Sequence, residues 1–225
     1  MLRKTLKNTF LFSGLVVLTA CASTPPPHES TDGLILQSDT RFGQVYKRPG
    51  ADLTRYAKYG LVDCQVNFKK NWMRDQNSSR INLSNRVTKD DVENIKESLS
   101  EACDEQFKQA LENAPAYNLV ESFDHGDAIM VLRPNIVNLD VNSPDVKSAS
   151  MSRSYTTEAG EMTLVLELLD GSSGEVLVRI MDRESGQNSG RMQWTNSVTN
   201  KSDANRILKR WAEQLRKGLD AVTSK

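Results

Sequence analysis

Few side chains in this sequence have the types and spacing that chemistry requires. His125 lies between Asp124 and Asp127, and these three groups together could bind a metal ion. The same residue types are expected in a tight turn between two strands, because their side chains hydrogen-bond to the neighbouring main chain. A turn explains these residues without a ligand, so we expect no metal site.

Two pairs of carboxylates, Glu158 with Glu161 and Asp182 with Glu184, are close enough in sequence for general acid-base catalysis. Such pairs are also common in loops and at the solvated ends of strands. The sequence contains no phosphate-binding glycine loop, no His-Glu-x-x-His, no Gly-x-Ser-x-Gly and no Cys-x-x-Cys. We therefore expect no enzymatic activity, no catalytic residue and no cofactor.

Tryptophan and arginine occur close together at two places. Trp72 precedes Arg74, and Arg191 precedes Trp194, in polar stretches beside predicted strands. Both residue types are enriched at interaction hot spots, so these pairs are candidates for a binding surface. The simpler alternative is a tryptophan that covers the edge of the core beside a solvated arginine.

The start of the chain has the pattern of an export leader. Basic residues come first, an apolar stretch runs from Thr9 to Leu18, and two small residues follow. The apolar stretch is about half as long as a membrane-spanning helix. Cys21 comes directly after Leu-Thr-Ala, an arrangement that resembles the bacterial lipobox. In that motif the cysteine carries diacylglycerol and an amide-linked acyl chain, such as palmitate. We therefore expect residues 1–20 to be a lipoprotein signal peptide.

The residues after Cys21 predict the compartment and the tether. Ala22 and Ser23 stand where an Asp usually signals retention in the inner membrane. We therefore expect an outer-membrane anchor with the domain facing the periplasm. Residues 21–32 form the lipidated cysteine and a proline-rich tether, which would hold the domain about 30 Å from the bilayer. Residues 33–225 form one globular domain, which begins with an irregular arm at 33–59 and a short strand at 44–47.

The charge balance limits the partners of the mature chain. The leader holds three of the 29 basic residues and none of the 29 acidic ones, so the mature chain has a small negative net charge. This balance favours neither nucleic acid nor an anionic lipid surface as a partner.

Two cysteines remain besides the lipidated one. Cys64 and Cys103 form an even pair, which favours a disulfide in an oxidising compartment. Cys64 lies on the apolar face of a predicted strand and Cys103 on the apolar stripe of a predicted helix, where the two could meet. Two buried free thiols are the alternative. A catalytic thiol is not expected, because burial disfavours ionisation.

The pattern of apolar residues predicts the elements around these positions. Alternation indicates a strand over 60–69, followed by a polar connector over 70–86. A helix should begin at Thr88, where Asp91 completes a capping box, and end near Asn113. A last helix should begin near Asn200 or Ser202, with Arg216 among its solvated residues. Four further strands are predicted at 117–123, 128–141, 161–170 and 175–184.

The element order β-α-β-β-β-β-α predicts an α+β fold. We expect a two-layer sandwich in which two amphipathic helices cover one face of a mostly antiparallel sheet of about five strands. The other face would carry Val165 and Leu177 and would be only partly apolar. It is a second candidate interaction surface, covered either by the arm or by a partner.

Five runs of residues are distinctive in combination: Asp39–Gly43, Arg48–Leu53, Lys70–Trp72, Ala159–Leu168 and Trp194–Asn200. Together they resemble a family of Gram-negative lipoproteins classified only as a domain of unknown function (family 3313). The resemblance extends from about residue 33 to residue 222. It implies an envelope location and a single domain, and it supplies no active site.

The expected function follows from the anchor and the missing catalytic groups. We expect an outer-membrane lipoprotein that binds or braces another cell-envelope protein without catalysis. A periplasmic binder of a small molecule, a lipid or a glycan is the alternative, and a deep apolar pocket would favour it.

Overall fold

The computed structural model describes residues 25–78, 86–122, 128–141, 154–156, 160–185, 193–195 and 197–223. Several positions considered above lie outside these residues. They are the signal peptide, Cys21, the stretch from Asp124 to Asp127, Glu158 and Arg191.

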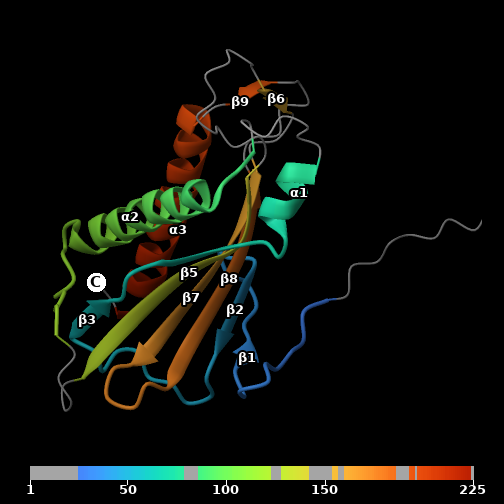
Figure 1. The fold of residues 1–225 in the computed structure, drawn as a ribbon. Helices are drawn as coiled ribbons and strands as arrows, with labels where there is room; N and C mark the ends of the chain where they lie inside the picture. The colour runs from blue at the N-terminus through green and yellow to red at the C-terminus, as the bar shows by residue number, and fades with distance from the viewer. Residues whose placement is uncertain are drawn as a thin grey trace, which may run out of the picture.

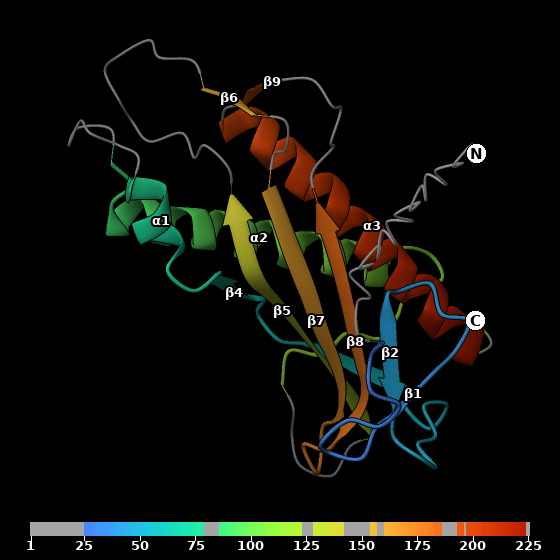
Figure 2. The same ribbon diagram turned by 90° about the vertical axis from the view of Figure 1, so that its right-hand side faces the viewer.

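The fold is α+β, as the element order predicts, and is built on a mixed sheet of seven strands. The strand order is β1-β2-β8-β7-β5-β3, with β4 also paired to β5. β3 and β4 run parallel to β5, and the other pairs are antiparallel. Figures 1 and 2 show this open, twisted sheet. The strands are β1 (Ile35–Leu36), β2 (Gln44–Lys47), β3 (Lys58–Leu61), β4 (Gln65–Phe68), β5 (Ile129–Val141), β7 (Gly160–Asp170) and β8 (Val176–Ser185).

Two strands more than expected belong to this sheet, and two others form a separate pair. The arm at 33–59 does not cover the sheet as a lid; it adds β1 and β2 at one edge and begins β3 at the other. The short strand predicted at 44–47 is confirmed as β2. The separate two-stranded pair consists of β6 (Ser154–Thr156) and β9 (Gln193–Thr195).

Two long helices cover one face of the sheet, as predicted (Figure 2). α2 (Lys89–Glu112) begins after Thr88, whose side chain accepts a hydrogen bond from the Asp91 N–H while the Asp91 carboxylate accepts one from the Thr88 N–H. α3 (Ser197–Thr223) starts a few residues earlier than expected. A short helix, α1 (Trp72–Ser78), lies in the stretch predicted to be a connector.

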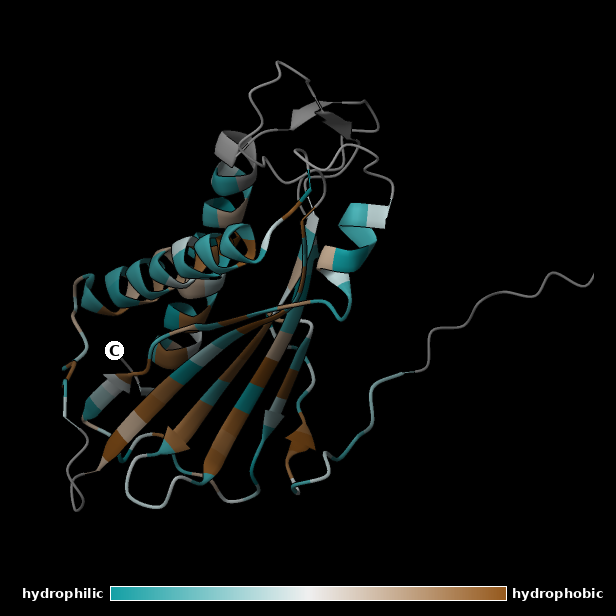
Figure 3. Cartoon of the chain, in the orientation of Figure 1, coloured by the Kyte–Doolittle hydropathy of each residue, from teal (hydrophilic) through white to brown (hydrophobic). Residues whose placement is uncertain are grey.

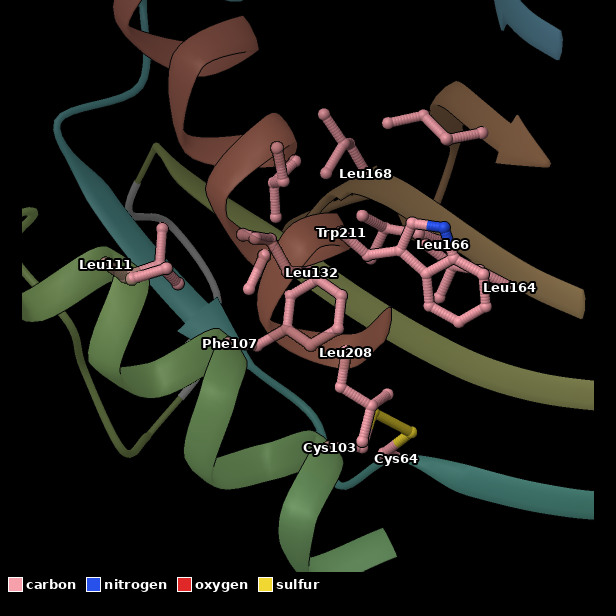
Figure 4. Close-up of a cluster of buried hydrophobic side chains, with 14 of the residues drawn as sticks. Cys64, Cys103, Phe107, Leu111, Leu132, Leu164, Leu166, Leu168, Leu208 and Trp211 are labelled. Carbon is pink, nitrogen blue, oxygen red and sulfur yellow. A yellow bond between two sulfur atoms is a disulfide. The ribbon is translucent and has the colours of Figure 1, made fainter. Parts of the chain in front are cut away.

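The core lies between this helical layer and the sheet. Alternate residues of β5 and β7 point toward the helices, where they meet the apolar stripes of α2 and α3. Figure 4 shows Trp211 and Leu208 of α3 and Phe107 of α2 packed against leucines of the sheet. Figure 3 shows that the outer surface of α2 is hydrophilic, while hydrophobic residues concentrate along the strands.

A proline divides the predicted strand 60–69 into β3 and β4. The Val62 N–H donates to the Leu132 carbonyl of β5 at 2.9 Å. In a parallel ladder the next bond would come from the N–H of residue 134 to the Val62 carbonyl. Residue 134 is proline and has no N–H, so the ladder stops there. Pairing with β5 resumes at Gln65.

The break between β3 and β4 is attached to α2. A disulfide joins Cys64 to Cys103, 39 residues later in the chain (Figure 4). The Cys64 N–H donates to Asp104 at 2.8 Å, and the Ser100 hydroxyl donates to the Cys64 carbonyl at 2.6 Å. These contacts supply the main-chain partners that the interrupted ladder does not.

Arg216 of α3 caps the C-terminal end of α2. Its guanidinium donates to the carbonyl oxygens of Ala110, Asn113 and Pro115 at 2.5 to 3.0 Å, and its Nε donates to Asp220 at 2.8 Å. The last carbonyls of a helix have no partner within the helix and attract positive charge. The prediction that Arg216 is solvated is therefore wrong: the residue is buried.

The strand predicted at 117–123 does not form within the described residues. The Tyr117 N–H donates to the Leu111 carbonyl, and the Tyr117 ring packs against Tyr59 and under the Arg216 guanidinium. These contacts use the segment to close the end of α2. Only a single parallel bridge, from Leu119 to Tyr59, joins it to the sheet.

The Arg216 contacts make a stability prediction. Replacing Arg216 with Ala leaves buried carbonyls without their donor and removes the ion pair with Asp220, so the free energy of unfolding should fall by about 3 kcal/mol. Urea denaturation measures this change. The neighbouring Lys217→Ala variant, at an exposed position, is the control and should change the value by less than about 0.5 kcal/mol. Equal effects of the two variants would contradict the capping role.

The disulfide makes a second prediction. Alkylation of the non-reduced, unfolded protein should leave Cys64 and Cys103 unlabelled in its mass spectrum. Reduction should lower the free energy of unfolding by about 3 to 4 kcal/mol, the value that the chain-entropy model gives for a loop of this length. Two labelled thiols without reductant would show that the bond is absent.

Candidate functional site

The sheet face opposite the helices is the candidate site. No helix in the described part of the chain covers it (Figure 2). Because side chains alternate along a strand, the residues of β5, β7 and β8 that do not enter the core lie on this face. We call it the open face. It consists of Val131, Arg133, Asn135, Val137, Asp140, Glu161, Thr163, Val165, Glu167, Arg179, Met181 and Arg183, with Lys69 joined to it through Asp140.

A row of ion pairs crosses the open face from strand to strand. Glu167 of β7 lies between Arg133 of β5 and Arg179 of β8, with N–O distances of 2.6 and 2.8 Å. Arg179 also binds both carboxylate oxygens of Asp32, at 2.9 and 2.8 Å. The row therefore links three central strands to the N-terminal part of the chain.

The carboxylates of this row are held in their charged form. Burial by itself raises the pKa of Glu167, but the hydrogen bonds from Arg133 and Arg179 outweigh it, so its pKa lies below the usual value. Hydrogen bonds from Arg179 and Ser30 hold the pKa of Asp32 well below its usual range. Neither group is suited to exchange protons near neutral pH.

A second group of ion pairs lies further along the open face. Arg183 pairs with Glu161, and Lys69 pairs with Asp140 at 3.0 Å. Between the two groups lie the half-buried side chains of β5, β7 and β8 that carry no charge. They are Asn135, Val137, Thr163, Val165 and Met181. The open face therefore has a mainly apolar centre bounded by ion pairs.

The N-terminal segment is bound to the domain from residue 27, before the start at residue 33 that the sequence predicts. The Tyr46 hydroxyl donates to the Pro27 carbonyl at 2.9 Å, and the Leu36 N–H donates to the His28 carbonyl at 2.8 Å. Leu34 is fully buried. Residues 27–32, which the composition assigns to the tether, are thus bound to the domain.

The structure separates the residues expected to form a binding surface. Trp72 is buried, stacks on Phe68 with ring centroids 4.2 Å apart, and donates its Nε1–H to the Val141 carbonyl at 3.2 Å. Arg74 is exposed and pairs with the adjacent Asp75. For this pair the simpler alternative holds: the tryptophan covers the edge of the core.

Val165 and Leu177, which were expected on the same face of the sheet, lie on opposite faces. Val165 lies half-buried on the open face, but Leu177 belongs to the core, because a bulge between Leu168 and Leu169 shifts its register. Trp194 lies on β9, paired with Tyr155 of β6.

The two carboxylates of β8, Asp182 and Glu184, both have partners on the helix side of the sheet. Asp182 accepts from Trp211 Nε1 at 2.7 Å and from the Gly43 N–H at 2.8 Å. Glu184 pairs with Arg210 at 2.5 Å. A side chain at Gly43 would meet the Asp182 oxygen at 2.9 Å, which explains the glycine. These contacts give both groups structural roles.

The described residues hold neither a metal-binding cluster nor a membrane-spanning helix. They contain no cluster of three or more His, Cys, Asp or Glu residues that could hold a metal ion. None of the described helices has the length and apolar character to cross a bilayer.

Sequence reasoning missed the ion-pair row, although one signal was present. Glu167 interrupts an otherwise apolar run in the predicted strand 161–170, and a buried carboxylate requires basic partners. Arg133 and Arg179 occupy the neighbouring predicted strands, but their register with Glu167 comes only from the sheet.

The row predicts a pH dependence. Because the pKa of Glu167 is lowered, its contribution to stability is complete above about pH 4.5, the ordinary value, and is lost as the pH falls below it. Glu167→Gln should cost about 2 kcal/mol at pH 7 and much less at pH 3. Thermal unfolding at both pH values measures this, with Glu97→Gln on the exposed side of α2 as the control. A pH-independent cost would contradict the charged role.

Comparisons with known proteins add the family. A search of curated proteins finds no match. Solved structures that resemble the chain include the PelC dodecamer from Paraburkholderia phytofirmans (14% identity, 76% of this chain and 98% of that one, TM-score 0.36). Another is protein XCC0632 from Xanthomonas campestris (9%, 78% and 90%, 0.38). A third is a minor lipoprotein from Acinetobacter baumannii (13%, 74% and 94%, 0.34). Similarity at this level does not establish a shared function.

The sequence match is more specific. Residues 30–215 match the family model described as "Protein of unknown function (DUF3313)", which confirms the resemblance noted in the sequence. The chain therefore belongs to the DUF3313 family.

Proposed function

We propose that this protein is an outer-membrane lipoprotein whose domain works without catalysis, as an interaction module of the cell envelope. The open face is its contact surface. The proposal combines two parts, an anchor at Cys21 and a rigid binding face, and each part has its own support.

The open face carries the interaction role. Val131, Val137, Val165 and Met181 remain partly in contact with solvent there, although the helices bury the equivalent positions on the other face. Cross-strand ion pairs hold the surrounding side chains in place. A surface whose side chains are held by ion pairs in this way can bind a partner with little loss of side-chain freedom.

The anchor is supported by the leader and by where the fold begins. Cys21 follows a stretch with the pattern of an export leader, and among the described residues, which begin at 25, the first hydrogen bond to the domain is at Pro27, six residues after Cys21. A short tether between a lipidated residue and a folded domain is the arrangement that this function needs.

The partners of the candidate catalytic carboxylates support a role without catalysis. Glu161 and Glu184 are held in ion pairs and Asp182 accepts hydrogen bonds from Trp211 and Gly43, so all three carboxylates are poorly placed to transfer protons.

Fractionation of cells tests the anchor. The wild-type protein should be found in the outer-membrane fraction, and Cys21→Ser should leave it soluble in the periplasm or unprocessed in the inner membrane. The intact mass should show a diacylglyceryl group and an added acyl chain on Cys21. A wild-type protein without acylation, or a Cys21→Ser variant that stays in the outer membrane, would refute the anchor.

A further inference from the structure

The chain leaves the domain on the side of the open face. Pro27 is bound by Tyr46, and Asp32 by Arg179; Tyr46 and Arg179 are direct cross-strand partners of β2 and β8. Arg179 belongs to the open face. Figure 1 shows the same arrangement: the first described residues lie on the side of the sheet away from α2 and α3. An anchor upstream of Pro27 therefore pulls on the open-face side of the domain.

The reach of that anchor is short. Five residues separate Cys21 from Pro27. A fully extended chain spans at most about 3.6 Å per residue, so Pro27 lies no more than roughly 20 Å from the lipidated cysteine. The structure shortens the tether of about 30 Å expected from composition, because residues 27–32 belong to the fold. The open-face side of the domain is therefore held near the membrane surface.

Three cations of the open face are more exposed than the carboxylates they pair with, whereas Arg179, with 22% of its side chain exposed, lies deeper than Asp32 with 37%. Arg183 has 69% of its side chain exposed against 29% for Glu161, and Arg133 has 44% against 12% for Glu167. Lys69 has 54% against 23% for Asp140. In all three pairs the carboxylate lies deeper, so a surface that approaches this face meets ammonium and guanidinium groups first. The net charge of the whole chain disfavours an anionic surface as a partner. It does not reveal that these cations are more exposed than the carboxylates they pair with.

We propose that the open face lies on the anionic headgroup layer of the membrane that holds Cys21, with Arg133, Arg183 and Lys69 in contact with lipid phosphates. This inference rests on the proposed anchor and names the partner of the same face. Arginine forks and lysine ammonium groups are the side chains that bind phosphate oxygens. Basic groups near an anionic bilayer are attracted over about one screening length. The apolar centre of the face would lie against the headgroups between these contacts.

Energy transfer in vesicles tests the orientation. The acylated, full-length mature protein is reconstituted in vesicles of phosphatidylglycerol with phosphatidylcholine, with an acceptor dye on a headgroup. A donor dye is placed at Asn135→Cys on the open face or at Gln109→Cys on the exposed side of α2. Transfer should be higher from residue 135 than from residue 109. The difference should decrease in about 1 M salt, where the screening length is roughly 3 Å, and in vesicles of phosphatidylcholine alone, because only the short tether then holds the open-face side near the bilayer.

Charge variants test the contacts themselves. Lys69→Gln with Arg183→Gln removes two exposed cations and leaves the Glu167 row intact, so the fold is retained. Lys209→Gln with Lys217→Gln removes the same charge from the exposed side of α3. The first pair should reduce the difference in transfer, and the second should preserve it.

The outcomes separate the two proposals. Protein that fails to float with vesicles of either composition lacks the anchor, which overturns the proposed function and this inference with it. Protein that floats but shows equal transfer from both positions, or responds equally to both charge variants, keeps the anchor and overturns the inference. In that case the open face binds another partner, such as an acidic protein surface.

Discussion

The structure depends on a single side chain that joins its two long helices. The end of α2 presents main-chain carbonyls that no residue of α2 can satisfy, and Arg216 satisfies them from α3 while Asp220 and Tyr117 position its guanidinium. The helices are thereby fixed to one another and pack as one layer. A layer built in this way covers one face of the sheet and leaves the other to be stabilised by its own side chains. On that uncovered face, charged side chains of neighbouring strands pair with one another, and these ion pairs take the place of contacts with a helix.

Local periodicity was sufficient to predict the long elements. β5, β7, β8 and α2 were found with nearly correct limits, because each has an unbroken pattern of period 2 or 3.6 and α2 also has a complete capping box. The α+β class and the placement of both helices on one face followed from these elements. The seven-residue helix α1 was missed, since its length allows only two turns and no clear stripe.

Features that depend on distant residues could not be read from the sequence. Arg216 lies beside the apolar stripe of its helix and therefore looks solvated, and its acceptors lie about a hundred residues away. The division of the strand at 60–69 is determined by Pro134 on another strand, and this signal could have been used once β5 was predicted. For the open face, the alternation identified Val165 correctly, but one bulge moved Leu177 into the core. Trp72 is of a residue type that is common at interaction hot spots, but it is buried in the fold, so residue type alone did not identify a binding surface.

The bond between Cys64 and Cys103 has a consequence for how such a chain would reach its compartment. The reducing cytosol keeps thiols apart, and disulfides form and persist in oxidising compartments such as the bacterial periplasm. In the proposed export route, the disulfide between the sheet edge and α2 can therefore form only after translocation. Before the disulfide forms, the unfolded chain has no closed loop between residues 64 and 103, so it is less stable when folded and easier to keep unfolded for export. The final increment of stability would thus be acquired only at the site of action, and only in an oxidising environment.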